Sequence, residues 1–105
     1  MKSAMPLMTA VAISLSGTAA LAADGPQLLK EKGCLACHTL DKKLVGPAYK
    51  DVAAKYKARK DAEAYLSKKI LGGSTGVWGP VPMPPNGTVK AEEAKTLAKY
   101  ILTVK

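Results

Sequence analysis

The segment Cys34-Leu35-Ala36-Cys37-His38 constrains this chain more than any other stretch of it. Two thiols with two residues between them can both reach one flat porphyrin, and a histidine placed directly after them can bind its iron. These are the only two cysteines and the only histidine among the 105 residues, so the chain offers no competing set. The motif therefore predicts one covalently attached c-type haem, with His38 as an axial ligand of the iron.

A Cys-x-x-Cys pair alone also occurs in thiol redox enzymes, zinc sites and structural disulfides. A zinc site needs four ligands, and two cysteines with one histidine supply only three. A thioredoxin-like enzyme needs alternating strands and helices, which the sequence does not indicate. A disulfide closing so short a loop would constrain the unfolded chain little. Haem attachment is the interpretation that uses all three residues.

The first 22 residues have the pattern of a cleaved secretory signal peptide. Lys2 supplies the positive charge, residues 7–21 are mostly small and apolar, and Ala20-Leu21-Ala22 fits a cleavage site. The alternative is an uncleaved membrane anchor, but hydroxyl residues and a glycine interrupt the stretch, which is short of the roughly 20 apolar residues of a spanning helix. We expect export to the periplasm, with residues 23–105 as one domain.

A domain of this size buries a marginal core and usually needs additional stabilisation. The chain has no phenylalanine and one tryptophan, so its own core is thin. A covalently held haem would supply a large apolar surface on which helices can pack. We therefore expect the haem-free protein to be largely unfolded.

The chain is basic, with 16 Lys and Arg against 8 Asp and Glu and a net charge of +8. The basic residues are scattered and are not interleaved with aromatic residues, which argues against nucleic-acid binding. A solvated lysine surface would explain the charge. Alternatively, the charge steers the protein towards an acidic redox partner or an anionic membrane surface.

Apolar residues recur at helical spacing in four segments, which predicts an all-α fold of about four helices around one haem. The first helix begins at Asp24 to Pro26 and continues to Lys32, and the others cover about 49–57, 62–71 and 91–103. Asp24 and Asp61 are the expected N-caps. The expected buried positions of the later helices are Tyr49, Val52, Ala53, Tyr56, Ala62, Tyr65, Leu66, Ile70, Ala94, Leu97, Ala98 and Ile101.

Glycines mark two expected features near helix ends. Gly33 would allow a close approach of another element just before Cys34. Gly72-Gly73 would end the third helix. The segment 74–88 that follows has no helical or alternating period and is rich in proline and glycine. It is either an ordered loop or a disordered one, and long ordered loops tend to be functional.

Met83 is the candidate for the sixth iron ligand, because the other methionines (Met1, Met5 and Met8) belong to the predicted signal peptide. Prolines surround it, and a residue before proline is held in extended geometry. Methionine also fills gaps in protein cores, which is the alternative role. Ligation by methionine and histidine raises the reduction potential and leaves no open site on iron, which argues against peroxidase, oxygenase and gas-binding roles.

These motifs together resemble one family. From residue 23 onwards the chain resembles the small bacterial class I cytochromes c, of the cytochrome c-551 type. The resemblance rests on five segments, which are Lys32 to His38, Val45 to Lys55, Gly76 to Pro80, Met83 to Asn86 and Thr96 to Tyr100.

The resemblance implies roles for four further residues. The Pro47 carbonyl would accept a hydrogen bond from the ring of His38, and the Asn86 amide would donate to the Met83 sulfur. Trp78 would reach a haem propionate through its indole N–H, unless it is only a packing residue. Lys69 would pair with a propionate, unless it is a solvated lysine.

The resemblance also implies a crossing of the first and last helices near Gly33 and Tyr100, and an apolar docking patch at the haem edge. The patch would comprise Leu35, Leu44, Pro80, Val81, Pro84 and Pro85, with Lys42 and Lys43 near its rim.

The implied function is that of a monomeric periplasmic one-electron carrier, not an enzyme. It would take electrons from a quinol-oxidising complex or another cytochrome, and pass them to a nitrite reductase or a terminal oxidase. Transient contact with a membrane surface is compatible with its charge. A small haem peroxidase and a haem-based gas sensor are the competing functions, and both need a sixth site on iron that opens easily.

Overall fold

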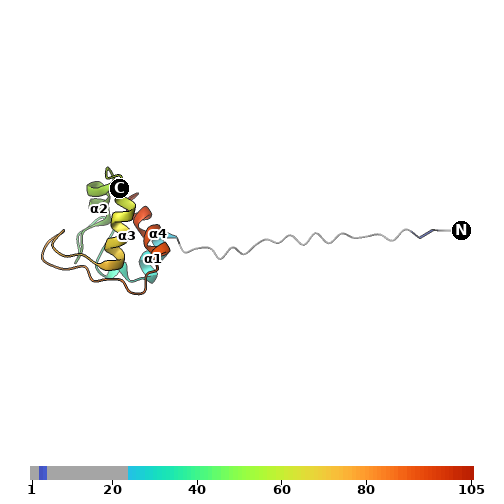
Figure 1. Ribbon diagram of the computed structural model, residues 1–105, viewed down its shortest axis with the longest axis horizontal. Helices are drawn as coiled ribbons and strands as arrows, with labels where there is room; N and C mark the ends of the chain where they lie inside the picture. Colours follow the sequence, from blue (N-terminus) through green and yellow to red (C-terminus); the bar gives the residue numbers. More distant parts are fainter. Residues whose placement is uncertain (1–2, 5–23) are drawn as a thin grey trace.

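The computed structural model describes residues 3–4 and 24–105, so almost all of the predicted signal peptide lies outside the described residues. The elements are α1 (Gly25–Glu31), a short 3₁₀ helix η1 (Cys34–Ala36), α2 (Tyr49–Tyr56), α3 (Ala62–Gly72) and α4 (Ala91–Ile101) (Figure 1). Across the described ranges the extended structure is limited to one isolated antiparallel bridge. The predicted all-α class is confirmed. None of the helices described is long and apolar enough to cross a bilayer.

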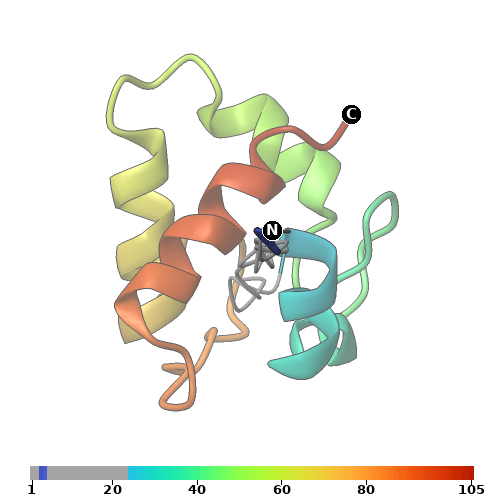
Figure 2. The same ribbon diagram turned by 90° about the vertical axis from the view of Figure 1, so that its right-hand side faces the viewer.

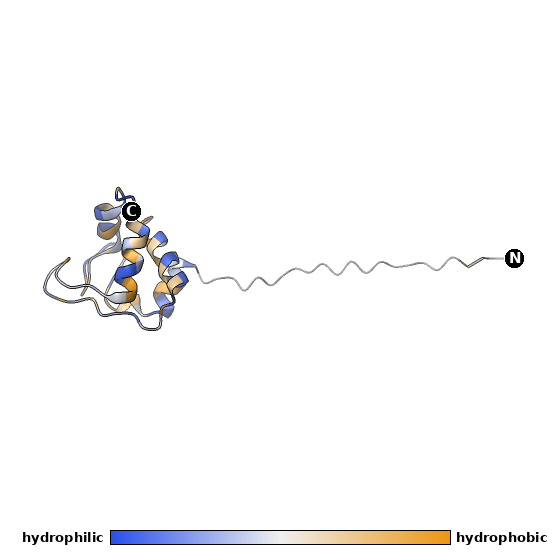
Figure 3. Ribbon diagram, viewed as in Figure 1, coloured by the Kyte–Doolittle hydropathy of each residue, from blue (hydrophilic) through white to orange (hydrophobic). Residues whose placement is uncertain are grey.

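The core lies where α4 packs against its neighbours. α3 runs beside α4, and α1 crosses α4 (Figure 2). Hydrophobic and hydrophilic residues alternate along the helices, as the colours in Figure 3 show. Leu28 and Leu97 are the largest side chains that are fully buried. The buried positions expected in α2 and α4 are all confirmed, as are Ala62, Leu66 and Ile70 of α3, whereas Tyr65 is only half-buried.

The contact between α1 and α4 differs from the expected one. It is Gly25, not Gly33, that lies against Tyr100, since a side chain on Gly25 would overlap the Tyr100 ring and its Cβ. Nothing lies within 4 Å of the position that a Cβ on Gly33 would occupy. Gly33 instead has a left-handed backbone (φ 73°), which lets the chain turn from α1 into η1.

One of the two expected N-caps is confirmed. The Asp24 carboxylate accepts a hydrogen bond from the backbone N–H of Gln27 at 2.9 Å. Asp61 precedes α3 but makes no capping bond, because its carboxylate is paired with the Arg59 guanidinium. Its backbone (φ −100°, ψ 19°) also lacks the extended geometry that an N-cap normally has.

The loop between α3 and α4 is ordered and closed at its base (orange in Figure 1). The Ser74 N–H donates to the Met83 carbonyl at 3.0 Å, and the Met83 N–H donates to the Ser74 carbonyl at 2.8 Å. α3 ends at Gly72, and Gly73 takes a positive φ of 76°. A Cβ on Gly73 would lie 2.5 Å from the Met83 carbonyl oxygen, so glycine is needed for this close return of the chain.

Candidate functional site

A cavity of about 640 Å³ lies between η1, α2, α3 and the long loop. Its walls are mainly apolar, and its volume is within the range typical of small-molecule and cofactor sites. All eight site residues predicted from the sequence line it, and they are Cys34, Cys37, His38, Pro47, Lys69, Trp78, Met83 and Asn86. The fold thus brings together residues that are far apart in the chain.

The two cysteines reach the cavity because η1 is a single tight turn. The N–H groups of Cys37 and His38 both donate to the Cys34 carbonyl, at 3.2 and 3.0 Å. Both thiols are free and half-buried. Burial raises the pKa of the Cys34 thiol, while a hydrogen bond with the Tyr49 side chain acts in the opposite direction. A raised thiol pKa is the reverse of what a nucleophilic redox cysteine requires.

His38 is held by three neighbours. Its Nδ1 lies 2.8 Å from the Pro47 carbonyl oxygen, and since a carbonyl only accepts, Nδ1 carries the proton. Its ring stacks on the Tyr49 ring, with centroids 4.7 Å apart and planes 20° apart. A Cβ on Gly46 would lie 2.5 Å from His38 Cε1, so the backbone passes directly against the ring. The unprotonated Nε2 is left to bind a metal.

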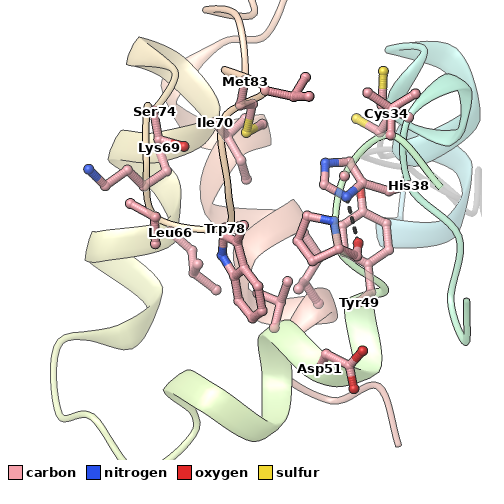
Figure 4. Close-up of a pocket in the computed structure, with 18 of the residues that line it drawn as sticks. Cys34, His38, Tyr49, Asp51, Leu66, Lys69, Ile70, Ser74, Trp78 and Met83 are labelled. Carbon is pink, nitrogen blue, oxygen red and sulfur yellow. Dashed lines mark hydrogen bonds between the residues drawn. The ribbon is translucent and has the colours of Figure 1, made fainter. Parts of the chain in front are cut away.

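Met83 lies on the wall of the cavity opposite His38 (Figure 4). The backbone bridge to Ser74 fixes its main chain at the base of the loop. A thioether and an imidazole that face each other across an apolar cavity form a suitable pair of axial ligands for haem iron.

The Asn86 amide makes a contact that differs from the expected one. Its Nδ2 donates to the Ile70 carbonyl at 2.8 Å, and its backbone N–H approaches the same oxygen at 3.3 Å. Asn86 therefore fastens the loop to the end of α3. The amide has a second N–H, so donation to the Met83 sulfur stays a prediction.

Trp78 and Lys69 belong to a group of aromatic rings and cations on the α2 and α3 side of the cavity. The Trp78 ring meets Tyr56 edge-on at 6.3 Å, and the Lys55 ammonium lies 4.6 Å from the Trp78 ring centroid. The Lys69 ammonium is 5.2 Å from the Tyr65 ring. Cations and an indole N–H are suited to the carboxylates of a haem, and the contacts of Trp78 and Lys69 with haem propionates stay predictions.

Two features of this site were not predicted. Tyr49 was expected only on the buried face of its helix, and no contact was expected for Gly46. Both in fact contact His38. Their position within two residues of Pro47, the expected partner of His38, was the available signal.

The residues present fit a covalently attached haem. The structure combines two free thiols on one turn, an imidazole with Nε2 available, an opposing thioether and apolar walls. The thiols would attach the porphyrin, the imidazole and the thioether would bind its iron, and the apolar walls would contact its faces. The cavity lies between the imidazole and the thioether.

The family model described as cytochrome c matches residues 22–105. The chain belongs to the cytochrome c family. Its cofactor is accordingly a covalently attached haem c, and cytochromes of this kind are electron carriers.

Named relatives align with this cytochrome c over nearly all of their own length. Cytochrome c-551 of Pseudomonas aeruginosa is 54% identical over 99 residues, which is 89% of this chain and 94% of the relative. Cytochrome c-551 of Stutzerimonas stutzeri is 50% identical over 105 residues, covering all of both chains. The crystal structure of cytochrome c552 from Nitrosomonas europaea superposes with a TM-score of 0.75 at 55% identity, covering 76% of this chain and 99% of that one.

Proposed function

We propose that this cytochrome c is a periplasmic one-electron carrier whose haem iron is held between His38 and Met83. The single observation that carries the proposal is the placement of these two side chains on opposite walls of one cavity that also holds both cysteines. If His38 and Met83 both bind the iron, the iron would have no site for a substrate, and the protein would exchange electrons only.

The haem, when bound, supplies an iron that alternates between the ferric and ferrous states. His38 and Met83 would hold this iron in place. The Pro47 carbonyl fixes the tautomer of His38, and the bridge at Ser74 fixes the backbone of Met83. When the ligands move little between the two oxidation states, little reorganisation energy opposes electron transfer. The apolar walls would keep water away from the metal.

The surface around the cavity mouth supports transient docking of a redox protein. Leu44 and Val81 are 52% and 61% exposed, and Leu35 is 42% exposed. Pro80, Pro84 and Pro85 are exposed in the loop that carries Val81, between α3 and α4. Lys42 and Lys43 are exposed beside Leu44. An apolar patch rimmed by positive charge suits short-lived contact with acidic partners.

The partners we propose are a quinol-oxidising complex or another cytochrome as donor, and a nitrite reductase or terminal oxidase as acceptor. We also propose that residues 1–22 are a cleaved export signal, that residues 23–105 are the working domain, and that it acts as a monomer. The match of the family model from residue 22 onwards supports this division.

A spectroelectrochemical titration of the holoprotein tests the proposal, because it reports axial ligation and potential together. The oxidised protein should be low-spin with the weak far-red sulfur-to-iron band, and it should titrate as one electron. Met83→Ala should abolish this band and lower the midpoint potential, since a thioether favours ferrous iron.

Thr75→Ala is the control, because Thr75 is an exposed residue of the same loop that does not line the cavity, and it should leave band and midpoint unchanged. High-spin, five-coordinate oxidised protein, or an unaltered spectrum and midpoint in Met83→Ala, would contradict the proposal. A reduced protein that binds carbon monoxide rapidly would favour a gas sensor instead.

A further inference from the structure

Tyr49 packs against the histidine of the attachment motif. Its ring stacks on the imidazole of His38, with centroids 4.7 Å apart and planes 20° apart. The residue is only 4% exposed. Tyr49 is neither a predicted attachment residue of the haem nor a predicted ligand of its iron.

A single hydrogen bond does not fix the plane of the His38 ring. The bond from Nδ1 to Pro47 holds only one atom of the ring. The ring plane can still tilt about an axis that runs from the Cβ of His38 to Nδ1. The flat face of Tyr49, stacked at a 20° interplanar angle, opposes this turn. The Gly46 backbone limits how far the ring can move within its site.

The backbone places Tyr49 and His38 in one rigid frame. The Tyr49 N–H donates at 3.0 Å to the carbonyl of Thr39, the residue after His38, and the Gly46 N–H donates at 2.7 Å to the carbonyl of Cys37, the residue before it. One backbone bond therefore ties the start of α2, and the other ties the chain just before it, to the two sides of the histidine. Movement of the His38 backbone relative to Tyr49 has to strain these bonds.

We propose that Tyr49 is a positioning residue that sets the plane of the His38 imidazole, with its stacked ring as the acting group. The plane of an axial imidazole decides which iron d orbitals it overlaps, and hence how unpaired spin spreads over the porphyrin. The inference rests on the proposed ligation of iron by His38.

The test uses three holoprotein variants. Tyr49→Phe keeps the ring and loses the hydroxyl, whereas Tyr49→Leu keeps an apolar side chain and loses the stack. Leu28→Ala is the control, because it weakens the core at a fully buried residue that does not line the cavity. Proton NMR of the oxidised protein gives the shifts of the porphyrin methyl groups, and hydrogen exchange gives the opening rate of the His38 Nδ1–H bond.

In Tyr49→Leu the methyl shifts should spread into a different pattern, and Nδ1–H exchange should exceed that of Leu28→Ala about two- to twelvefold. This factor corresponds to the loss of one aromatic pair. Tyr49→Phe should keep the wild-type methyl pattern and exchange rate.

If Tyr49→Leu keeps the wild-type methyl pattern, or exchanges no faster than Leu28→Ala, the positioning role is wrong and Tyr49 only stabilises the fold. The same is true if Tyr49→Phe changes the pattern as much as Tyr49→Leu does. Failure of the proposed function is recognised separately, because the wild-type protein itself would then not be low-spin and six-coordinate.

Discussion

Gly46 is the residue at which the smallest change should disturb the metal site. A Cβ there would lie 2.5 Å from Cε1 and 2.8 Å from Nδ1 of His38. In Gly46→Ala the ring must move, which weakens its bond to Pro47, and crowding of this kind costs about 1–3 kcal/mol of stability. Thermal unfolding and the midpoint potential of the holoprotein should both change.

The control for Gly46→Ala is Gly87→Ala, since nothing lies within 4 Å of a Cβ at Gly87. This variant should keep the wild-type midpoint. Equal behaviour of the two variants would mean that the backbone at Gly46 does not constrain His38.

At the residue scale, the groups that meet a metal could be predicted because their chemistry is rare in this chain. One histidine, two cysteines and one methionine beyond the predicted signal peptide leave little choice. The partners of those groups were harder to predict. The stacking of Tyr49 depends on how the loop from His38 to Pro47 folds back, and the amide of Asn86 donates to the carbonyl of Ile70 near the end of α3.

The crossing of α1 and α4 depends on the absence of a side chain at one position. Gly25→Ala would force a methyl group into the Tyr100 ring, where even the Cβ is too close. We expect a loss of about 1–3 kcal/mol in the free energy of unfolding, measured by denaturant titration.

The control for Gly25→Ala is Gly72→Ala. Gly72 is also a helical glycine, but a Cβ there would meet nothing within 4 Å. It should be neutral or stabilise the protein by up to about 1 kcal/mol. A Gly25→Ala protein as stable as Gly72→Ala would show that the helices can shift apart freely.

Glu93 joins the start of α4 to the end of α1. Its carboxylate accepts from the Lys90 N–H at 2.9 Å and lies 3.3 Å from the Lys32 ammonium, and these contacts hold the pKa of Glu93 below its ordinary 4.5. Because the folded pKa is the lower one, the stabilisation is complete above pH 4.5 and is lost as the pH falls through the folded value.

Glu93→Gln should therefore be less stable than the wild type at neutral pH, and the difference should shrink on acidification. Melting temperatures measured between pH 3 and 7 test this. Glu92→Gln, a change of the same charge in the same helical turn, should show a smaller effect at neutral pH. A constant difference between Glu93→Gln and the wild type at all pH values would contradict the prediction.

The four α-helices, and the first residues of α2, α3 and α4, could be predicted from the periodic apolar residues, whereas η1 and the last residues of the helices could not. α4 ends at Ile101, two residues before the expected Thr103, whose hydroxyl and N–H both turn back to the Tyr100 carbonyl. Asp61 has the residue type of a cap, yet Arg59 two positions earlier competes for its carboxylate. Such local competition is decided by geometry that the sequence pattern does not contain.

For the whole molecule, the rate of electron transfer to an acidic partner should depend more on where the positive charges lie than on the net charge. Lys42 and Lys43 are exposed beside the apolar patch, whereas Lys95 and Lys99 are exposed on α4 and do not line the cavity. Changing Lys42 and Lys43 together to Glu should slow electron transfer to an acidic partner and weaken its dependence on salt, because steering acts through the approaching face.

The control changes Lys95 and Lys99 together to Glu, which alters the net charge equally. Stopped-flow rates at low ionic strength should fall more for the first pair than for the second. Equal rates for the two double variants would place the docking face elsewhere.

The two hydrogen bonds between Ser74 and Met83 separate the base of the long loop from its tip. Between them, only Trp78 is engaged by rings of the main body, and the prolines on the return side are exposed. Apart from Trp78 and its neighbours that line the cavity, the tip can therefore vary in sequence while the sulfur stays in place. Related chains would then be free to diversify their choice of partner there without retuning the metal.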